Sequence, residues 1–209
     1  LVEDLTPLNI DSGPTLFNHN ISIEGLNCYV SSFLKWTTVG NRAEAVFGRI
    51  EGLISVSDEQ GNFYYKQAGL TSTLDGLTDE SVYLINRERG STSAQLLLQG
   101  GERILHNDDY GFDYSFTTGE ANWFPWCISV SRVITSVVRD HKEKINSITD
   151  SHGNQWTSQG VGTSNTLQEF EPGKGYLVSV NEGFSLTILE IDDRSGALDS
   201  QFPIHPSVS

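Results

Sequence analysis

The sequence contains one pattern of residues twice, and this repetition constrains the fold more than any other feature. FNHNISIEGLNCYV, from Phe17, matches FDYSFTTGEANWFP, from Phe112; LISVSDEQGNFYY then matches INSITDSHGNQWT, and LDGLTDESVYLIN matches LQEFEPGKGYLVS. The three blocks keep their order at shifts of 95, 92 and 93 residues, which chance would rarely produce. The matched pairs include Ile21 with Phe116, Asn27 with Asn122, Tyr29 with Phe124, Val56 with Ile148, Asp58 with Asp150, and Tyr83 with Tyr176.

The repeat predicts two modules with peripheral segments around them. Module 1 is predicted over residues 17–100 and module 2 over residues 112–191, with residues 101–111 as a linker between them. Residues 1–16 are predicted to form an extended arm. Residues 192–209 contain two prolines and few apolar residues, which indicates a peripheral tail.

The spacing of apolar residues predicts mainly strands in each module. NISIEGLNCYVSSF and ANWFPWCISV alternate with period 2, which is typical of half-buried strands, and Pro125 indicates an edge or a bulge. Hairpin turns are predicted at 58–62 and 150–154, where Asp and Asn side chains can cap the turn and Gly supplies a positive φ. RAEAVFGRI and SRVITSVVRDHKEKI each have the spacing of a short helix.

These elements together predict the fold class. It is mainly β (a β-rich α+β fold), with two tandem small antiparallel modules of sandwich-like or barrel-like form, each carrying one short helix. An aromatic content of 10 % is enough for a real core and makes global disorder implausible.

Charge argues against two classes of partner. The formal net charge is −14, and no window contains a cluster of Lys and Arg. Phosphate backbones and anionic lipid repel such a chain, so we expect neither nucleic acid nor a membrane as a partner. No apolar run approaches the length of a membrane span, and no signal peptide is visible.

The two cysteines, Cys28 and Cys127, lie in apolar alternating runs. No Cys or His group has the spacing of a zinc site. We therefore predict buried free thiols, with a disulfide between the two as the alternative.

The stretch EPGKGYLVSV, residues 171–180, raises the question of a phosphate-binding loop. Such a loop needs GxxxxGK[ST] and a helix after it, whereas Lys174 is followed by Gly175 and a strand-like run. The first copy has TDESVYLIN at this place and keeps only the strand pattern. A turn before a strand is the better interpretation.

Other candidate chemistry is weak. The five histidines are scattered and include no HExxH pair, and no GxSxG occurs. Acidic pairs in HNDDYGFD and EIDDRSGALD could serve glycoside hydrolysis or bind calcium, although neither fits the calcium-loop pattern. The residues concerned are Asp108, Asp109, Asp113, Asp192, Asp193 and Asp199. We predict no catalytic residue, cofactor or metal.

The tryptophans offer a possible contact surface. Trp156 aligns with Tyr64 and Trp123 lies next to a shared Asn, so both are interpreted as core or hairpin-pair aromatics. Trp36 and Trp126 have no clear aromatic counterpart in the other copy. These two are therefore the predicted contact residues.

The second copy resembles a known kind of short β-rich repeat. ANWFPWCISV, ITDSHGNQWTS and LQEFEPGKGYLVSV are similar to an opening N-W-x-I strand, a D-x-x-G-x-x-[WY] hairpin and a closing L-x-P-G-x-G-Y-x-[VI] strand. Such repeats occur in structural proteins of tailed phages and other viruses and in bacterial cell-surface proteins. The first copy departs from the pattern, because DESVY replaces PGKGY. The resemblance implies an assembly or interaction role and carries no catalytic residues with it.

Three functions follow as expectations. The first is a non-enzymatic virion structural protein, capsid-decorating or tail-associated, that contacts other virion proteins and copies of itself. The second is a secreted or cell-surface adhesion module with a possible glycan ligand, which predicts exposed aromatic side chains. The third and weakest is a hydrolase that uses an acidic pair.

Overall fold

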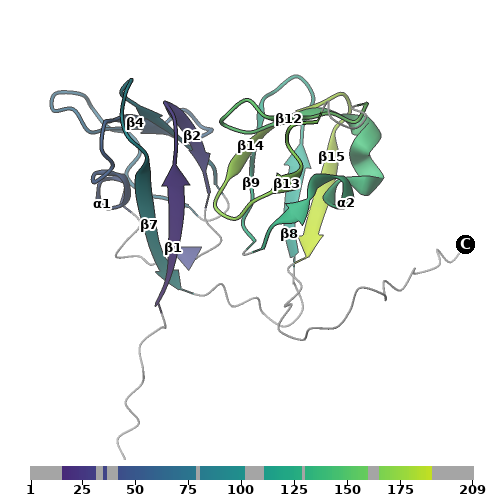
Figure 1. Ribbon diagram of the computed structural model, residues 1–209, viewed down its shortest axis with the longest axis horizontal. Helices are drawn as coiled ribbons and strands as arrows, with labels where there is room; N and C mark the ends of the chain where they lie inside the picture. Colours follow the sequence, from purple (N-terminus) through teal and green to yellow (C-terminus); the bar gives the residue numbers. More distant parts are fainter. Residues whose placement is uncertain are drawn as a thin grey trace, which may run out of the picture.

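The computed structural model describes residues 16–31, 35–36, 42–78, 81–101, 111–128, 130–159 and 165–189. Most of the predicted arm, linker and tail lies outside these residues. Figure 1 shows the two modules next to each other, with β1–β7 in module 1 and β8–β15 in module 2. Within the described ranges, no helix has the length and apolar character needed to cross a membrane.

Module 1 consists of two antiparallel sheets. One has three strands in the order β1-β7-β3, and the other has four in the order β2-β6-β4-β5. Apolar side chains from both sheets and from the helix form one core. The elements are β1 (Leu16–Ile23), β2 (Asn27–Val30), β3 (Lys35–Trp36), α1 (Ala43–Phe47), β4 (Leu53–Ser57), β5 (Phe63–Tyr65), β6 (Tyr83–Arg87) and β7 (Ala94–Gly101).

Module 2 repeats this arrangement. Its four-stranded sheet has the order β12-β11-β14-β9, and two-stranded sheets pair β15 with β8 and β10 with β13. A second, separate core fills it. The elements are β8 (Gly111–Phe116), β9 (Asn122–Pro125), β10 (Arg132–Val133), α2 (Ile134–Val137), the 3-10 helix η1 (Arg139–Lys144), β11 (Ile145–Thr149), β12 (Gln155–Trp156), β13 (Glu169–Phe170), β14 (Gly175–Val180) and β15 (Phe184–Leu189).

The prediction of a mainly β fold is confirmed. Strands alternate between core and surface as the period-2 pattern requires: Tyr83, Ile85 and Arg87 of β6 are buried while the residues between them are half-buried. Pro125 lies on β9, an edge strand of its sheet, where the absence of an N–H costs no ladder hydrogen bond.

Both hairpin turns form as predicted. The Asp58 carboxylate accepts hydrogen bonds from the backbone N–H and the side-chain amide of Asn62, each at 2.8 Å. Asp150 binds Asn154 in the same way, also at 2.8 Å for both bonds. These bonds satisfy turn donors locally, which is why Asp followed by Asn specifies the turn in both copies.

A tyrosine hydroxyl closes the loop before β6 and before β14. The backbone N–H of Thr78 donates to Tyr83 Oη at 2.7 Å, and that of Glu171 donates to Tyr176 Oη at 2.7 Å. Each tyrosine thus holds the residue five positions before it. Because both tyrosines make this contact, β6 and β14 are equivalent strands of the two modules.

The strand pairing corrects the predicted equivalence of β2 and β9. Tyr29 pairs with Leu84, and Trp123 pairs with Leu177. Because the leucines directly follow the two equivalent tyrosines, Tyr29 corresponds to Trp123. The predicted match of Tyr29 with Phe124, and that of Asn27 with Asn122, is wrong by one residue. Such a slip exchanges the two faces of a strand: Phe124 is buried in the core, whereas Tyr29 is half-buried on the opposite face.

The helices are short. In α1, Ala43 and Phe47 are buried, as the predicted spacing requires. The second predicted helix is divided into α2 and η1, and Ile145 already belongs to β11. The run ITSVV is rich in β-branched residues, which lose side-chain freedom in a helix, and this explains the early end of α2.

Candidate functional site

One of the two predicted contact tryptophans is a core residue. The Trp126 side chain is fully buried, stacks on Phe170 with ring centroids 4.9 Å apart, and donates its Nε1–H to the Val130 carbonyl at 2.9 Å. In this position the indole ring is removed from water and packed on another ring, and its Nε1–H keeps a hydrogen-bond acceptor. Trp126 is therefore removed from the contact surface. Trp36 is part of β3, but its side chain lies outside the described residues.

The predicted acidic and histidine candidates form no common site among the described residues. Asp108, Asp109, Asp192, Asp193 and Asp199 lie outside the described ranges. Asp113, on β8, accepts a hydrogen bond from Thr187 Oγ1 at 2.5 Å. The part of the chain that the structure describes contains no group of His, Cys, Asp and Glu side chains that could hold a metal ion.

The Gly-Lys-Gly turn packs against module 1. Gly173 has φ +78°, and the chain then enters β14, so this stretch is a turn before a strand as predicted. The Ser31 N–H donates to the Gly173 carbonyl at 2.9 Å, and Ser31 Oγ donates to the Lys174 carbonyl at 2.7 Å. Ser31 is 2 % exposed. The turn therefore uses its main chain to join the two modules.

Side chains from equivalent positions meet at this junction. Tyr29 and Trp123 are in contact edge to face, with ring centroids 5.3 Å apart and ring planes at 83°. Gly175 lies against Val82, its counterpart in module 1, and a Cβ added to Gly175 would overlap Val82 Cγ1. The junction is thus closely packed and needs glycine on one side only.

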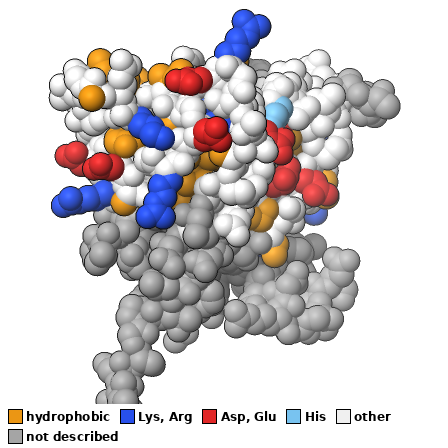
Figure 2. All heavy atoms as spheres, turned by 60° about the vertical axis from the view of Figure 1, so that its left-hand side comes forward, with side chains coloured by type: hydrophobic (Ala, Val, Ile, Leu, Met, Phe, Trp, Pro, Cys, Tyr) orange, Lys and Arg blue, Asp and Glu red, His pale blue; other side chains and the backbone are white. Residues whose placement is uncertain are grey.

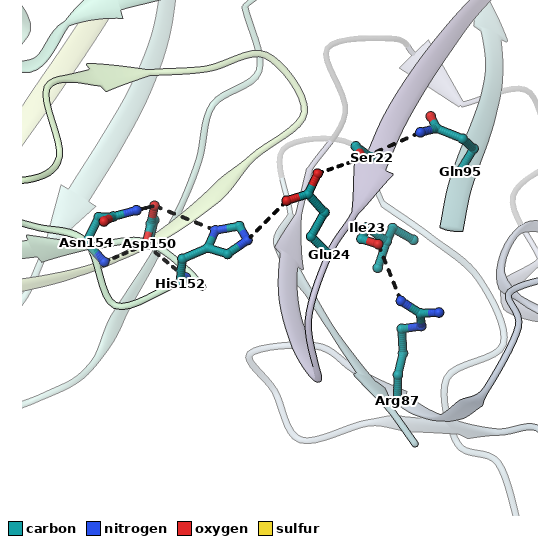
Figure 3. Close-up of polar contacts among 8 residues, drawn as sticks. All are labelled: Ser22, Ile23, Glu24, Arg87, Gln95, Asp150, His152 and Asn154. Atoms are coloured by element: carbon teal, nitrogen blue, oxygen red, sulfur yellow. Dashed lines mark hydrogen bonds and ion pairs between the residues drawn. The ribbon is translucent and has the colours of Figure 1, made fainter. Parts of the chain in front are cut away.

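A polar group lies at the rim of the junction (Figure 3). His152, in the module 2 hairpin turn, has its Nε2 3.9 Å from Glu24 Oε2 in module 1 and its Nδ1 3.9 Å from Asp150 Oδ2. The Glu24 and His152 side chains are 62 % and 37 % exposed. Solvent screens ion pairs of this kind, so the group contributes little energy to the junction.

Both cysteine thiols are buried and neither forms a disulfide. This state of Cys28 and Cys127 confirms the prediction. Burial raises the pKa of the Cys28 thiol, although the nearby Lys174 and Ser151 of module 2 act in the opposite direction. A thiol held in its neutral form is a poor nucleophile.

Module 1 also contains a buried arginine, which no local pattern of residues predicts. Arg87 is 2 % exposed and donates to the carbonyls of Glu51 at 3.1 Å, Ile23 at 3.3 Å, and Thr92. Figure 3 shows the bond to Ile23. Carbonyl acceptors compensate the buried charge, and its role here is structural.

The outward surfaces of the two four-stranded sheets meet at the junction, and we call them together the neutral face. They consist of side chains that alternate with the buried core positions on each strand, and Tyr29 and Trp123 join them. The residues are Asn27, Tyr29, Ser55, Ser57, Phe63, Tyr65, Leu84 and Asn86 in module 1, and Trp123, Ser147, Thr149, Gln155, Leu177 and Ser179 in module 2.

The outer edges of these sheets are covered by the chain itself. In module 1, the N–H groups of Phe63 and Tyr65 on β5 donate to Thr73 Oγ1 at 2.9 Å and to Ser72 Oγ at 3.0 Å. In module 2, the N–H of Gln155 donates to Thr166 Oγ1 at 2.9 Å. Because side chains occupy these donors, the edges are protected against pairing with another strand.

The candidate contact residues that sequence reasoning missed are Phe63 and Tyr65. Phe63 is 38 % exposed, and the two rings stack with centroids 5.6 Å apart and planes at 11°. The repeat contained a signal for them, because FYY at 63–65 in module 1 aligns with QWT at 155–157 in module 2. The equivalent outward positions are thus aromatic in one copy and polar in the other.

Comparison of this chain with protein-family models, with curated proteins and with solved structures gives no match.

Proposed function

We propose that this protein is a non-enzymatic virion structural component, capsid-decorating or tail-associated, that acts through contacts with other virion proteins and with copies of itself. The observation that carries the proposal is a pair of exposed apolar side chains at the two ends of the molecule: Leu70 is 52 % exposed and Val133 is 46 % exposed. Covering an exposed apolar side chain with a partner removes its surface from water, which favours association.

The two side chains lie far from the junction between the modules. Leu70 follows β5, the edge strand on the opposite side of the module 1 sheet from β2, and β2 borders the junction. Val133 directly precedes α2, which lies on the side of module 2 away from module 1 (Figure 1). Contacts at two different ends suit head-to-tail association, which builds rings or filaments.

The rest of the surface favours specific association over unspecific aggregation. Figure 2 shows a face on which apolar side chains form small groups separated by Lys, Arg, Asp and Glu side chains. The net charge of −14 opposes unspecific association. The virion location itself rests on the resemblance of the repeat to those of phage and other viral structural proteins.

The test is the state of the intact chain. We expect concentration-dependent association in sedimentation velocity, and the protein as a stoichiometric component of purified virus particles. Leu70→Glu with Val133→Glu should weaken association, because it places charge in the apolar contacts. Gln67→Glu with Gln159→Glu adds the same charge at exposed positions and should leave association unchanged. A chain that stays monomeric at every concentration and is absent from particles would rule out the proposal.

A further inference from the structure

We infer that the neutral face is a binding site for an uncharged carbohydrate chain. This inference goes beyond the proposed assembly role and does not depend on it. Paired positions form one row across each sheet, and the two rows meet at the contact between Tyr29 and Trp123. In order, the row contains Phe63, Ser57, Leu84 and Tyr29 in module 1, then Trp123, Leu177, Thr149 and Gln155 in module 2.

The aromatic side chains of the face suit the apolar surfaces of sugars. Phe63 and Tyr65 stand two residues apart on β5 with their rings nearly parallel, at 11°, and 5.6 Å between centroids. Tyr29 and Trp123 form a second ring pair at the junction. The C–H faces of a pyranose ring are apolar and can pack on an aromatic ring, whose own face carries partial negative charge.

The polar side chains of the face suit sugar hydroxyls. The half-buried Ser57 pairs with Phe63 and stands beside its ring. Ser55 pairs with Tyr65 but is only 9 % exposed, so the accessible polar group there is the half-buried Asn86 on the next strand. Hydroxyl and amide groups both donate and accept hydrogen bonds, as sugar hydroxyls do. Apolar surface with a few polar groups beside it is the usual composition of a small-molecule binding site.

The absence of charge on the face selects the ligand class. The chain has 13 Lys and Arg and 27 Asp and Glu, yet none of the residues that define the neutral face is charged. A phosphorylated, sulfated or uronic-acid ligand would find no cation there and would be repelled by a chain of net charge −14. An uncharged glycan needs no cation on the face and is not repelled by the net negative charge.

The fold itself does not require the two rings on β5. In module 2 the backbone N–H groups at the same edge also donate to side chains, that of Gln155 to Thr166 Oγ1 and that of Thr157 to Asn165 Oδ1. Yet Gln155 stands at the position of Phe63, and Thr157 at that of Tyr65. The rings are thus an addition of module 1 to a shared framework. Exposed rings that folding does not need are the side chains expected of a binding surface.

The spacing of the rings indicates an extended ligand. Tyr29 on β2 and Phe63 on β5 are separated by two intervening strands, or three strand spacings. With neighbouring strands about 4.8 Å apart, the two ring groups lie about 14 Å from each other. One sugar ring cannot reach both, so the face fits an oligosaccharide.

The full chain can be tested by affinity electrophoresis in gels that contain a soluble β-glucan, a mannan, a xylan or a galactan, with alginate as the acidic polymer. We expect retardation by at least one neutral polymer and none by alginate. Calorimetry with an oligosaccharide of the retarding polymer then gives the affinity. Phe63→Gln with Tyr65→Thr should weaken binding by at least about tenfold, because it removes both aromatic rings of β5 on which the sugar would pack.

The variant installs the residues that module 2 already has at these places, so we expect it to fold, and its melting temperature checks this. Val130→Ala, which trims an exposed apolar side chain outside the neutral face, should bind within about twofold of the parent. Retardation by no neutral polymer, unchanged affinity in the Phe63→Gln, Tyr65→Thr variant, or equal binding of alginate would each overturn the inference. None of these results bears on association through Leu70 and Val133.

Discussion

Tyr29 and Trp123 occupy equivalent positions in the two modules, and their rings touch each other, with centroids 5.3 Å apart. Val82 and Gly175 are a second equivalent pair in contact. Equivalent residues meet in this way only close to an approximate two-fold axis, as at the interface of a symmetric dimer. The junction is thus a dimer-like interface that is built within one chain.

Gly175→Ala is expected to destabilise the protein by about 1–3 kcal/mol, because the new methyl group would overlap Val82 Cγ1 and lie 3.1 Å from Tyr29 Cβ. Urea unfolding of the parent and the variant measures the change. The φ of Gly175 is not in the left-handed region, so the cost comes from space and not from the backbone.

The double variant Gly175→Ala, Val82→Ala provides the control. Removal of the two Val82 methyl groups makes room, so the double variant should be less destabilised than the sum of the single variants. Strict additivity would show that the two positions do not meet as the structure places them.

The tyrosine hydroxyls should contribute similarly in both modules. Tyr83→Phe and Tyr176→Phe each leave a backbone N–H, of Thr78 or of Glu171, without its acceptor. We expect each substitution to lower the free energy of unfolding by about 1–2 kcal/mol. Tyr65→Phe removes a hydroxyl from a half-buried tyrosine on the neutral face and should cost much less. Equal losses in all three variants would contradict this explanation.

Stability should fall at alkaline pH. Burial raises the pKa of Tyr176, and also that of Tyr83, above the ordinary value of about 10. Above that value the unfolded chain releases phenolic protons that the folded chain retains, so unfolding becomes more favourable as pH rises. The stabilisation is fully present below pH about 10 and is lost as pH rises through the folded-state pKa values.

Urea midpoints measured between pH 8 and 11 check this dependence. In Tyr176→Phe the decline above pH about 10 should be shallower, because the variant has one fewer buried phenol to ionise. A decline as steep as that of the parent would assign the alkaline transition to other groups.

The thiols should react only when the protein opens. Cys28 is buried and its pKa is raised by that burial, so little thiolate is present near neutral pH. A thiol reagent such as dithionitrobenzoate should modify the folded chain slowly and both cysteines rapidly in denaturant. The rate in the folded state should rise in Gly175→Ala, since Lys174 and Ser151 lie near Cys28 at the junction. Rapid modification of the folded parent would contradict the described burial.

Local patterns of residues predicted the framework well. The Asp-and-Asn hairpin turns, the β strand after Gly-Lys-Gly and the edge position of Pro125 each depend on a few neighbouring residues. The alignment of β2 with β9 was predicted one residue out. It followed the chance identity of Asn27 and Asn122, whereas the correct alignment comes from the strand pairing, which only the structure shows.

Long-range packing accounts for what the sequence could not predict. The burial of Trp126 depends on Phe170, and that of Arg87 on the carbonyls of Glu51 and Ile23, which lie far away in the chain. The neutral face depends on two sheets being brought together, so no local pattern contains it. The one available signal was the difference between FYY and QWT at equivalent positions.

The contact between Val82 and Gly175 shows what a single chain can do that two identical chains cannot. On the axis of a homodimer every residue faces its own copy, so a bulky side chain must face an equally bulky one, and a gap must face a gap. Here module 1 contributes the valine side chain, and module 2 contributes the glycine that leaves room for it. Having both copies in one chain frees them to diverge where they touch, and that divergence fixes which surface of each module faces its neighbour.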